Sequence, residues 1–308
     1  MAADLKSRWA ARRWPQTMLV WAGAILVLSG AFHLVVFLVS GTSWDGPVSW
    51  RKPTLFGLSF GVTLLAVAWI MSYLPGQRRL GGLLAVALAG SSLAEVFLID
   101  MQRWRGVPSH FNFGTLFDSL VFSVGMAGFV AITATALVIL TVWAFVSAEG
   151  PPSTLLAIRA GLTMLLIAQA LGGAIVGAGN SQVNTISGFD PHTVRVFGPN
   201  GVIFGAAGIM KVPHGVALHG IQLLLGLAWL AGLARSSEAT RVRIVAAGTL
   251  GYAGILAVSA YQTFSGRAPL ALVPWASVIL WLSMFLLLGA LVAVVGMLLQ
   301  SRARSVRA

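Results

Sequence analysis

Eight stretches of the chain are apolar over about 20 residues, the length that an α-helix needs to cross roughly 30 Å of hydrocarbon. Charged residues are only 9 % of the 308 residues, whereas about a quarter is usual for a soluble domain. The sequence therefore predicts that lipid is the solvent of this chain. The runs lack the strict alternation of membrane β-strands, which argues against a β-barrel. The expected spans are 17–40, 53–74, 80–101, 115–147, 154–178, 213–234, 243–264 and 270–299.

The predicted fold class is all-α, a polytopic integral membrane bundle of eight transmembrane helices in a single domain, 1–308. Residues 1–16 and 300–308 are expected to be basic cytoplasmic tails, and 17–299 the bundle, with a long outer loop at 179–212. Residues 52–65 and 211–224 align without gaps, which matches Lys52 with Lys211 and Gly61 with Gly220. This match indicates a weak internal repeat of four spans plus four.

Basic residues are divided unequally between the two sides of the expected bundle. The side of the N-terminus holds thirteen of the twenty: Lys6, Arg8, Arg12, Arg13, Arg78, Arg79, Arg159, Arg235, Arg241, Arg243, Arg302, Arg304 and Arg307. The opposite side holds seven: Arg51, Lys52, Arg103, Arg105, Arg195, Lys211 and Arg267. The positive-inside rule then predicts a bacterial inner (plasma) membrane protein with both termini cytoplasmic and residue 190 outside. The net charge of +12 is a topology signal, and nucleic acid is not an expected partner because no basic domain exists to hold a duplex.

Two acidic residues of the third and fourth spans are candidate catalytic groups. Glu95 shares one helical face with Ser91 and Gln102, and an ionisable group within a span usually points into a protein interior or a cavity. Asp118 lies one turn into the fourth span, where it could equally cap the helix or complement its dipole. Glu95 and Asp118 are therefore candidates for an acid and a base, with a structural alternative open for Asp118.

Two histidines lie inside predicted spans. Counted from the outer ends of their helices, His33 and His219 are seven and six residues deep, and Glu95 is at a similar level in the third span. Three polar side chains at one depth predict a common site in the outer half of the bilayer. His110 and His192 are expected to be loop residues, and His214 lies in the first turn of the sixth span.

Three kinds of chemistry fit such a site. Haem b could take His33 and His219 as axial ligands, with small residues (Gly30, Gly215 and Gly220) leaving room for the macrocycle. Its propionates could pair with cations expected on that side, namely Arg51, Lys52, Arg105 and Lys211, near His214. A divalent metal held by His33, Glu95 and His219 is the rival, and Cys cannot contribute because the chain has none. In the simplest alternative no cofactor is bound and the histidines are interhelical hydrogen-bond donors.

The leading functional hypothesis from the sequence is a membrane redox protein that binds b-type haem and is linked to quinone. The first alternative is a membrane-embedded enzyme that acts on a lipid or isoprenoid by acid–base or metal chemistry. The second is a transporter in which Glu95 exchanges protons. All three place the lipid bilayer around the chain, and Glu95 takes part in the last two.

Overall fold

The computed structural model describes residues 13–76, 78–185, 206–234 and 236–306, and the regular secondary structure within these ranges is entirely helical. The helices are α2 (Trp14–Ser40), α3 (Arg51–Ile70), the 3₁₀-helix η1 (Met71–Tyr73), α4 (Arg78–Trp104), α5 (Leu116–Leu120), the π-helix η2 (Val121–Met126), α6 (Ala127–Ser147), α7 (Pro152–Thr185), α8 (Lys211–Leu233), α9 (Glu238–Phe264) and α10 (Pro274–Val306).

The prediction of eight helices long and apolar enough to cross a membrane is confirmed. Their ends differ from the expected ones in several places. The third span continues to Trp104, so Gln102 and Arg103 are helical rather than part of the outer loop, and the seventh begins at Glu238. The fifth span continues to Thr185, which shortens the expected loop 179–212. The candidate loop residues 190, His192 and Arg195 lie outside the described residues.

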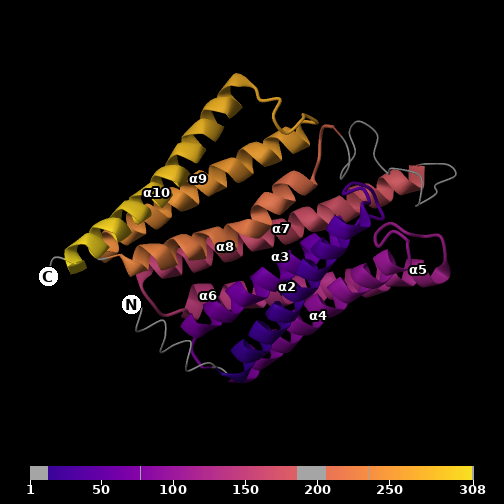
Figure 1. The fold of residues 1–308 in the computed structure, drawn as a ribbon, viewed down its shortest axis with the longest axis horizontal. Coiled ribbons are helices and arrows are strands. Elements are labelled where there is room, and N and C mark those ends of the chain that lie inside the picture. The colour runs from indigo at the N-terminus through magenta and orange to yellow at the C-terminus, as the bar shows by residue number, and fades with distance from the viewer. Residues whose placement is uncertain (1–12, 77, 186–205, 235, 307–308) are drawn as a thin grey trace.

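The spans pack in two groups of four, and the same pairs recur in each group. In the first, α2 packs against α3 and α4, and α4 against α6. In the second, α7 packs against α8 and α9, and α9 against α10. The groups meet where α3 contacts α8 and where α6 contacts α7. Figure 1 shows α7 and α8 lying between the first group and the outlying pair α9 and α10.

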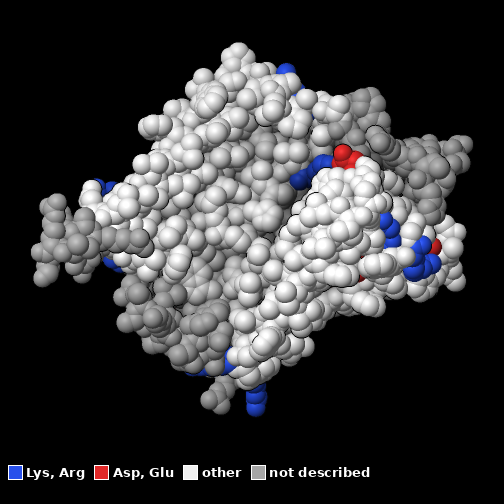
Figure 2. Space-filling model, viewed as in Figure 1, with Lys and Arg blue, Asp and Glu red and all other residues white. Residues whose placement is uncertain are grey.

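Charged side chains gather toward the ends of the helices on the face that Figure 2 shows, and the surface between them is almost free of charge. This distribution suits helices whose middle sections lie in hydrocarbon. The same view shows a hollow between the α2–α3 side and the α9–α10 side of the molecule, with charged residues of both signs at one end of it. The hollow therefore follows the junction of the two groups.

Glycines bring the backbones of α2 and α3 into direct contact. A Cβ added to Gly30 would lie 2.7 Å from the backbone nitrogen of Leu58, and one added to Gly57 would lie 2.7 Å from the backbone nitrogen of Gly30. Gly23 and Gly61 meet in the same way farther along the crossing. Gly57 and Gly61 are four residues apart on α3, the spacing that lets two membrane helices approach closely. This crossing is the tightest part of the first group.

The fourth span begins irregularly. After the short helix α5, residues Val121–Met126 form the π-helix η2 before the regular helix α6 begins. π-Turns are rare and are found disproportionately at functional sites. Hydropathy does not distinguish a π-turn from an α-turn, so the sequence predicts one uniform helix over 115–147.

We predict that Gly30→Ala destabilises the protein by about 1–3 kcal/mol, because the added methyl group forces apart two backbones already in contact. The matched control is Gly90→Ala in α4, where an added Cβ meets no atom within 4 Å. Thermal unfolding of the purified protein in detergent measures both. Equal melting temperatures for the two variants would contradict the close crossing.

Candidate functional site

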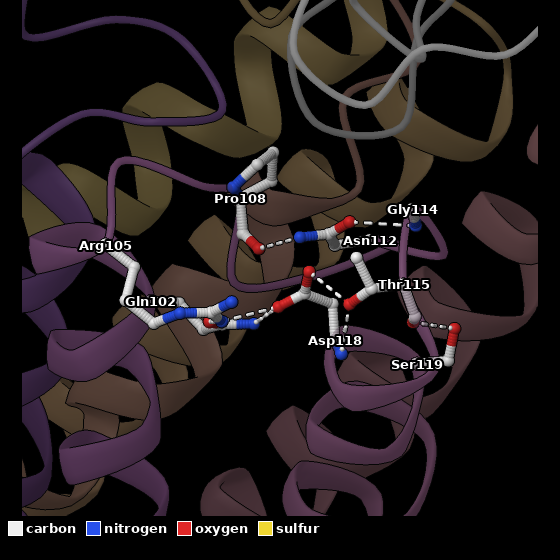
Figure 3. A network of polar contacts seen from close by, with 8 residues as sticks. All are labelled: Gln102, Arg105, Pro108, Asn112, Gly114, Thr115, Asp118 and Ser119. Carbon is white, nitrogen blue, oxygen red and sulfur yellow. Dashed lines mark hydrogen bonds and ion pairs between the residues drawn. The ribbon is translucent and has the colours of Figure 1, made fainter.

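A network of hydrogen bonds surrounds Asp118, which is 3 % exposed (Figure 3). Gln102 Nε2 donates to Asp118 Oδ1 over 2.9 Å, and Arg105 donates to the same oxygen over 2.6 Å. The Thr115 hydroxyl donates to Oδ2 over 2.8 Å and accepts from the Asp118 backbone N–H over 3.1 Å. Both carboxylate oxygens of Asp118 therefore have donors from the protein.

These contacts hold the segment between α4 and α5. Thr115 is the N-cap of α5 and Asp118 lies in its first turn, where a carboxylate suits the helix dipole. Asn112 continues the network by donating to the Pro108 carbonyl and accepting from the Gly114 N–H. The arrangement favours the structural alternative for Asp118, since a carboxylate with this many donors is a poor base.

Glu95 lies in the interior of the first group and has a different environment. It is 2 % exposed, and its Oε2 is buried without a hydrogen-bond partner in the described part of the chain. One turn earlier, Ser91 bonds to Thr133 of α6 over 2.7 Å, and two turns later Gln102 bonds to Asp118. The face of α4 that was predicted from the spacing of Ser91, Glu95 and Gln102 therefore lies in the interior and packs against the fourth span. An ionised carboxylate without a partner is costly there.

The π-helix η2 belongs to this neighbourhood. It contacts α4, and Leu98 of α4 lies against Gly125 of η2, where an added Cβ would be 2.9 Å from Leu98 Cδ1. Leu98 is three residues from Glu95. A buried acid whose Oε2 has no partner in the described part of the chain and a rare backbone form therefore lie against the same turn of α4.

His33 is buried in a second cluster near the C-terminal ends of α2 and α4. Its Nδ1 lies 2.9 Å from the Ser29 carbonyl, and its Nε2 accepts from Trp104 Nε1 over 3.1 Å. Because the indole N–H is only a donor, Nδ1 carries the ring proton and donates to Ser29. Asp100 Oδ2 lies 3.9 Å from Nδ1, and the His33 ring stacks on Trp50. Both ring nitrogens thus have protein partners.

The expectation that His33 and Glu95 share one depth is wrong. The parallel helices α2 and α4 are joined by two hydrogen bonds, His33–Trp104 and Ser29–Asp100. In each bond the two residues are 71 positions apart in the sequence. At that offset Glu95 is level with residue 24 of α2, nine positions before His33, which is about 13 Å along the helix. Depth counted from the helix ends failed because those ends are not level: Trp104, at the end of α4, lies beside His33, and α2 continues seven residues farther, to Ser40.

The two in-span histidines also differ in their surroundings. His219 is on an exposed face of α8, whereas His33 is 4 % exposed. The principal neighbours of α2 are α3 and α4, and those of α8 are α7, α9, α10 and α3. His214 lies beside α7, where its Nδ1 is 2.8 Å from the Ala168 carbonyl. No structural contact links His33 with His219 or His214 in the described residues.

These positions bear on the two cofactor hypotheses. Among the described residues no group of three or more His, Asp or Glu side chains could hold a metal ion, so His33, Glu95 and His219 are not gathered into the expected metal site. Axial ligation of haem by His33 and His219 also lacks support, because Trp104 occupies His33 Nε2 and the backbone of α3 fills the space beside Gly30. His33 does make a hydrogen bond between helices, but as the acceptor from Trp104 rather than as the expected donor.

The cations expected on one side do lie at one end of the bundle, but they divide between two surroundings. Arg105 pairs with Asp118. Arg51 and Lys52 begin α3, and Lys211 begins α8. Lys52 Nζ donates to the Ser109 hydroxyl over 3.3 Å, and that hydroxyl lies 2.9 Å from His110 Nδ1.

His110 is not the solvated loop residue that the sequence analysis expects. Its ring lies against Phe56, Phe111 and Phe122, with centroid distances of 5.8, 6.4 and 5.6 Å. Burial lowers the pKa of His110 well below its usual range, and the Lys52 ammonium lowers it further. His110 is therefore neutral, and its Nδ1 shares a hydrogen bond with the Ser109 hydroxyl, whose oxygen accepts from Lys52.

Sequence reasoning missed Asp100 and Trp104 as partners of His33. Their spacing carried a signal, since Ser29 and His33 are four residues apart and so are Asp100 and Trp104, which places each pair on one helical face. Comparison of the chain with protein-family models, with curated proteins and with solved structures found no match. The chemistry of the site therefore has to be argued from these contacts.

We predict that Asp118→Asn lowers the stability by about 2 kcal/mol, because it removes the buried charge that Arg105 and Gln102 share. The matched control is Asp45→Asn, whose carboxylate pairs with Arg51 while 71 % exposed and should contribute less than about 1 kcal/mol. Chemical denaturation in detergent measures both. Similar losses for the two variants would rule out the structural role of the network.

Proposed function

We propose that this protein is a proton-coupled transporter of the bacterial plasma membrane, in which Glu95 is the proton-binding group. The observation that carries the proposal is a carboxyl that is 2 % exposed, with one oxygen lacking any partner among the described residues. Ionisable groups retained inside membrane spans commonly belong to proton pathways, because their burial is too costly to persist without a function. The neighbouring π-helix supports a functional role for this region.

The arrangement of the helices gives independent support. Transporters are often built from two repeats, with the solute bound where the repeats meet. The recurring helix pairs fit a four-plus-four repeat. The aligned residues Lys52 and Lys211 are 159 positions apart, and Gln222 of α8 contacts Thr63 of α3 at the same offset, with 3.0 Å between amide and hydroxyl. A two-fold axis parallel to α3 and α8 would bring equivalent positions of the two repeats into contact, as Thr63 and Gln222 are.

The other hypotheses have less support. An acid–base enzyme would need Glu95 and Asp118 to converge on one substrate. Asp118 is level with Gln102, seven residues from Glu95 on α4, or about 10 Å. Asp118 also has donors on both oxygens. For haem to bind, His33 would have to lose its hydrogen bond with Trp104 and coordinate iron instead. α2 and α8 would also have to face each other.

For orientation we propose that both termini are cytoplasmic, from the excess of basic residues on that side. In this cysteine-free chain, Thr42→Cys in the α2–α3 loop should react with an impermeant maleimide on intact cells. Glu149→Cys in the α6–α7 loop should react only after permeabilisation. Both positions are exposed, so access is not limited by burial. Labelling of Glu149→Cys but not of Thr42→Cys on intact cells would show that the orientation is the opposite of the proposed one.

We predict that Glu95→Gln abolishes charge displacement by protons. A pH jump applied to proteoliposomes on a solid-supported membrane records a transient current when protons enter a low-dielectric site. The wild type should give the transient, and Glu95→Gln should lose it while keeping its melting temperature. Glu149→Gln makes the same chemical change at an exposed position and should keep the transient. A full-sized transient from Glu95→Gln would refute the assignment.

A further inference from the structure

A groove of about 300 Å³ lies between α9 and α10, the outlying pair of helices in Figure 1. One face of each helix lines it, and several of the lining residues are small: Ala247 of α9, and Gly289, Ala290 and Ala293 of α10. A Cβ added to Gly289 would meet no atom within 4 Å, so the floor of the groove is open. Phe285, which is 75 % exposed, stands at its edge. The groove is therefore an apolar slot that opens at the surface of the bundle.

The groove ends where α9 and α10 cross closely. A Cβ added to Gly251 would lie 2.5 Å from the Ser283 carbonyl oxygen, so no side chain separates the two backbones there. The α9 residues that line the groove, from Thr240 to Ala247, all precede this crossing. They extend over about 10 Å of the helix. The groove therefore runs from the crossing toward the N-terminal end of α9.

Arg243 lines the groove near the N-terminal end of α9. This helix has 27 residues and is about 40 Å long, close to the thickness of a bilayer with its headgroups. With the middle of the helix, near residue 251, at the middle of a bilayer, the hydrocarbon would end about 15 Å away, near residue 241. Arg243 would then lie where hydrocarbon gives way to lipid phosphates, within reach of a long side chain.

The exposed guanidinium of Arg243 has no acidic partner in the part of the chain that the structure describes. Its Nε donates to the Ala239 carbonyl over 3.3 Å. The nearby acid Glu238 is engaged elsewhere, since its carboxylate accepts from the Ser153 N–H over 2.8 Å and pairs with Arg241 at 3.5 Å. The sequence of α10 contains no Asp or Glu. This end of the groove is therefore complementary in charge to an anion.

We propose that the groove between α9 and α10 holds an acyl chain of an anionic phospholipid whose phosphate pairs with Arg243. The chain lies over Gly289 and Ala293, and the planar guanidinium can donate to two phosphate oxygens at once. Basic residues at the ends of spaces between membrane helices recognise anionic headgroups in this way. In the proposed orientation the lipid belongs to the cytoplasmic leaflet. This site goes beyond the proposed function and does not involve Glu95.

A second copy of the chain is the other occupant that an apolar groove could hold, and charge argues against it. A second α10 would cover Arg243 without offering a carboxylate, because that helix has no acidic residue. Burial of a guanidinium without an anion is costly. A phospholipid supplies both the apolar chain and the anion that the groove lacks.

The test is native mass spectrometry of the whole protein in detergent, titrated with dioleoyl phosphatidylglycerol or dioleoyl phosphatidylcholine. The first lipid bound should be held about fivefold more tightly when it is phosphatidylglycerol, as expected for one basic residue beside an anionic headgroup. Arg243→Gln should remove this preference, because it keeps the length of the side chain and loses the charge. Arg243 is exposed, so the variant should keep its melting temperature.

Gly289→Leu tests the groove rather than the charge. Its side chain fills the open floor, so it should also remove the preference for phosphatidylglycerol while the protein stays folded. The matched control is Gly296→Leu on the same helix, where an added Cβ likewise meets no atom within 4 Å but which does not line the groove. The control for charge is Arg79→Gln, at an exposed position in the first turn of α4. Both controls should bind phosphatidylglycerol as the wild type does.

Four outcomes would overturn the lipid site. Equal affinity of the wild type for the two lipids would remove the headgroup contact. An equal loss in Arg243→Gln and Arg79→Gln would leave only a general attraction between a basic protein and anionic lipid. A preference that Gly289→Leu keeps as fully as Gly296→Leu would place the lipid outside the groove. A wild-type dimer that Gly289→Leu converts to a monomer, without a lipid preference in either, would assign the groove to a second copy of the chain.

Discussion

The contact between the backbones of α2 and α3 determines much of the first group of helices. Because Gly30 and Gly57 leave no side chain between the helices, α3 is held against α2 at a fixed height. That height sets where the first turn of α3 ends up, with Trp50 stacked on His33 and Lys52 bonded to Ser109. The positions of the His33 cluster and of the cationic start of α3 therefore depend on the same glycine crossing.

The spans could be predicted because burial in hydrocarbon imposes a minimum length of apolar sequence, and that length is visible without any knowledge of packing. The interior face of α4 could be predicted for a similar reason, since the spacing of Ser91, Glu95 and Gln102 follows helix geometry alone. The gathering of Lys52 and Lys211 at one end followed from counting alternating spans. Each of these depends on one helix or on the order of helices.

What could not be predicted depends on how one helix is placed against another. The depth of Glu95 relative to His33 required the offset between α2 and α4, which is set by Trp104 and Asp100 rather than by hydropathy. His110 lies in a loop by sequence, yet Phe56, Phe111 and Phe122 from three segments enclose it. Asp118 could be read either as an acid or as a cap until the positions of Gln102 and Arg105 were known.

The π-helix η2 also solves a problem of length. Two contacts tie the fourth span to α4, Asp118 to Gln102 at one end and Thr133 to Ser91 at the other. Between them α4 uses 11 residues, from 91 to 102, while the fourth span uses 15, from 118 to 133. Wider turns take up more residues for each turn of the helix than α-turns do, so the six residues of η2, beside Glu95, take up part of this surplus. A deletion there would shorten the surplus and force a choice between the two contacts, which makes this segment a natural place for the fourth span to slip relative to α4.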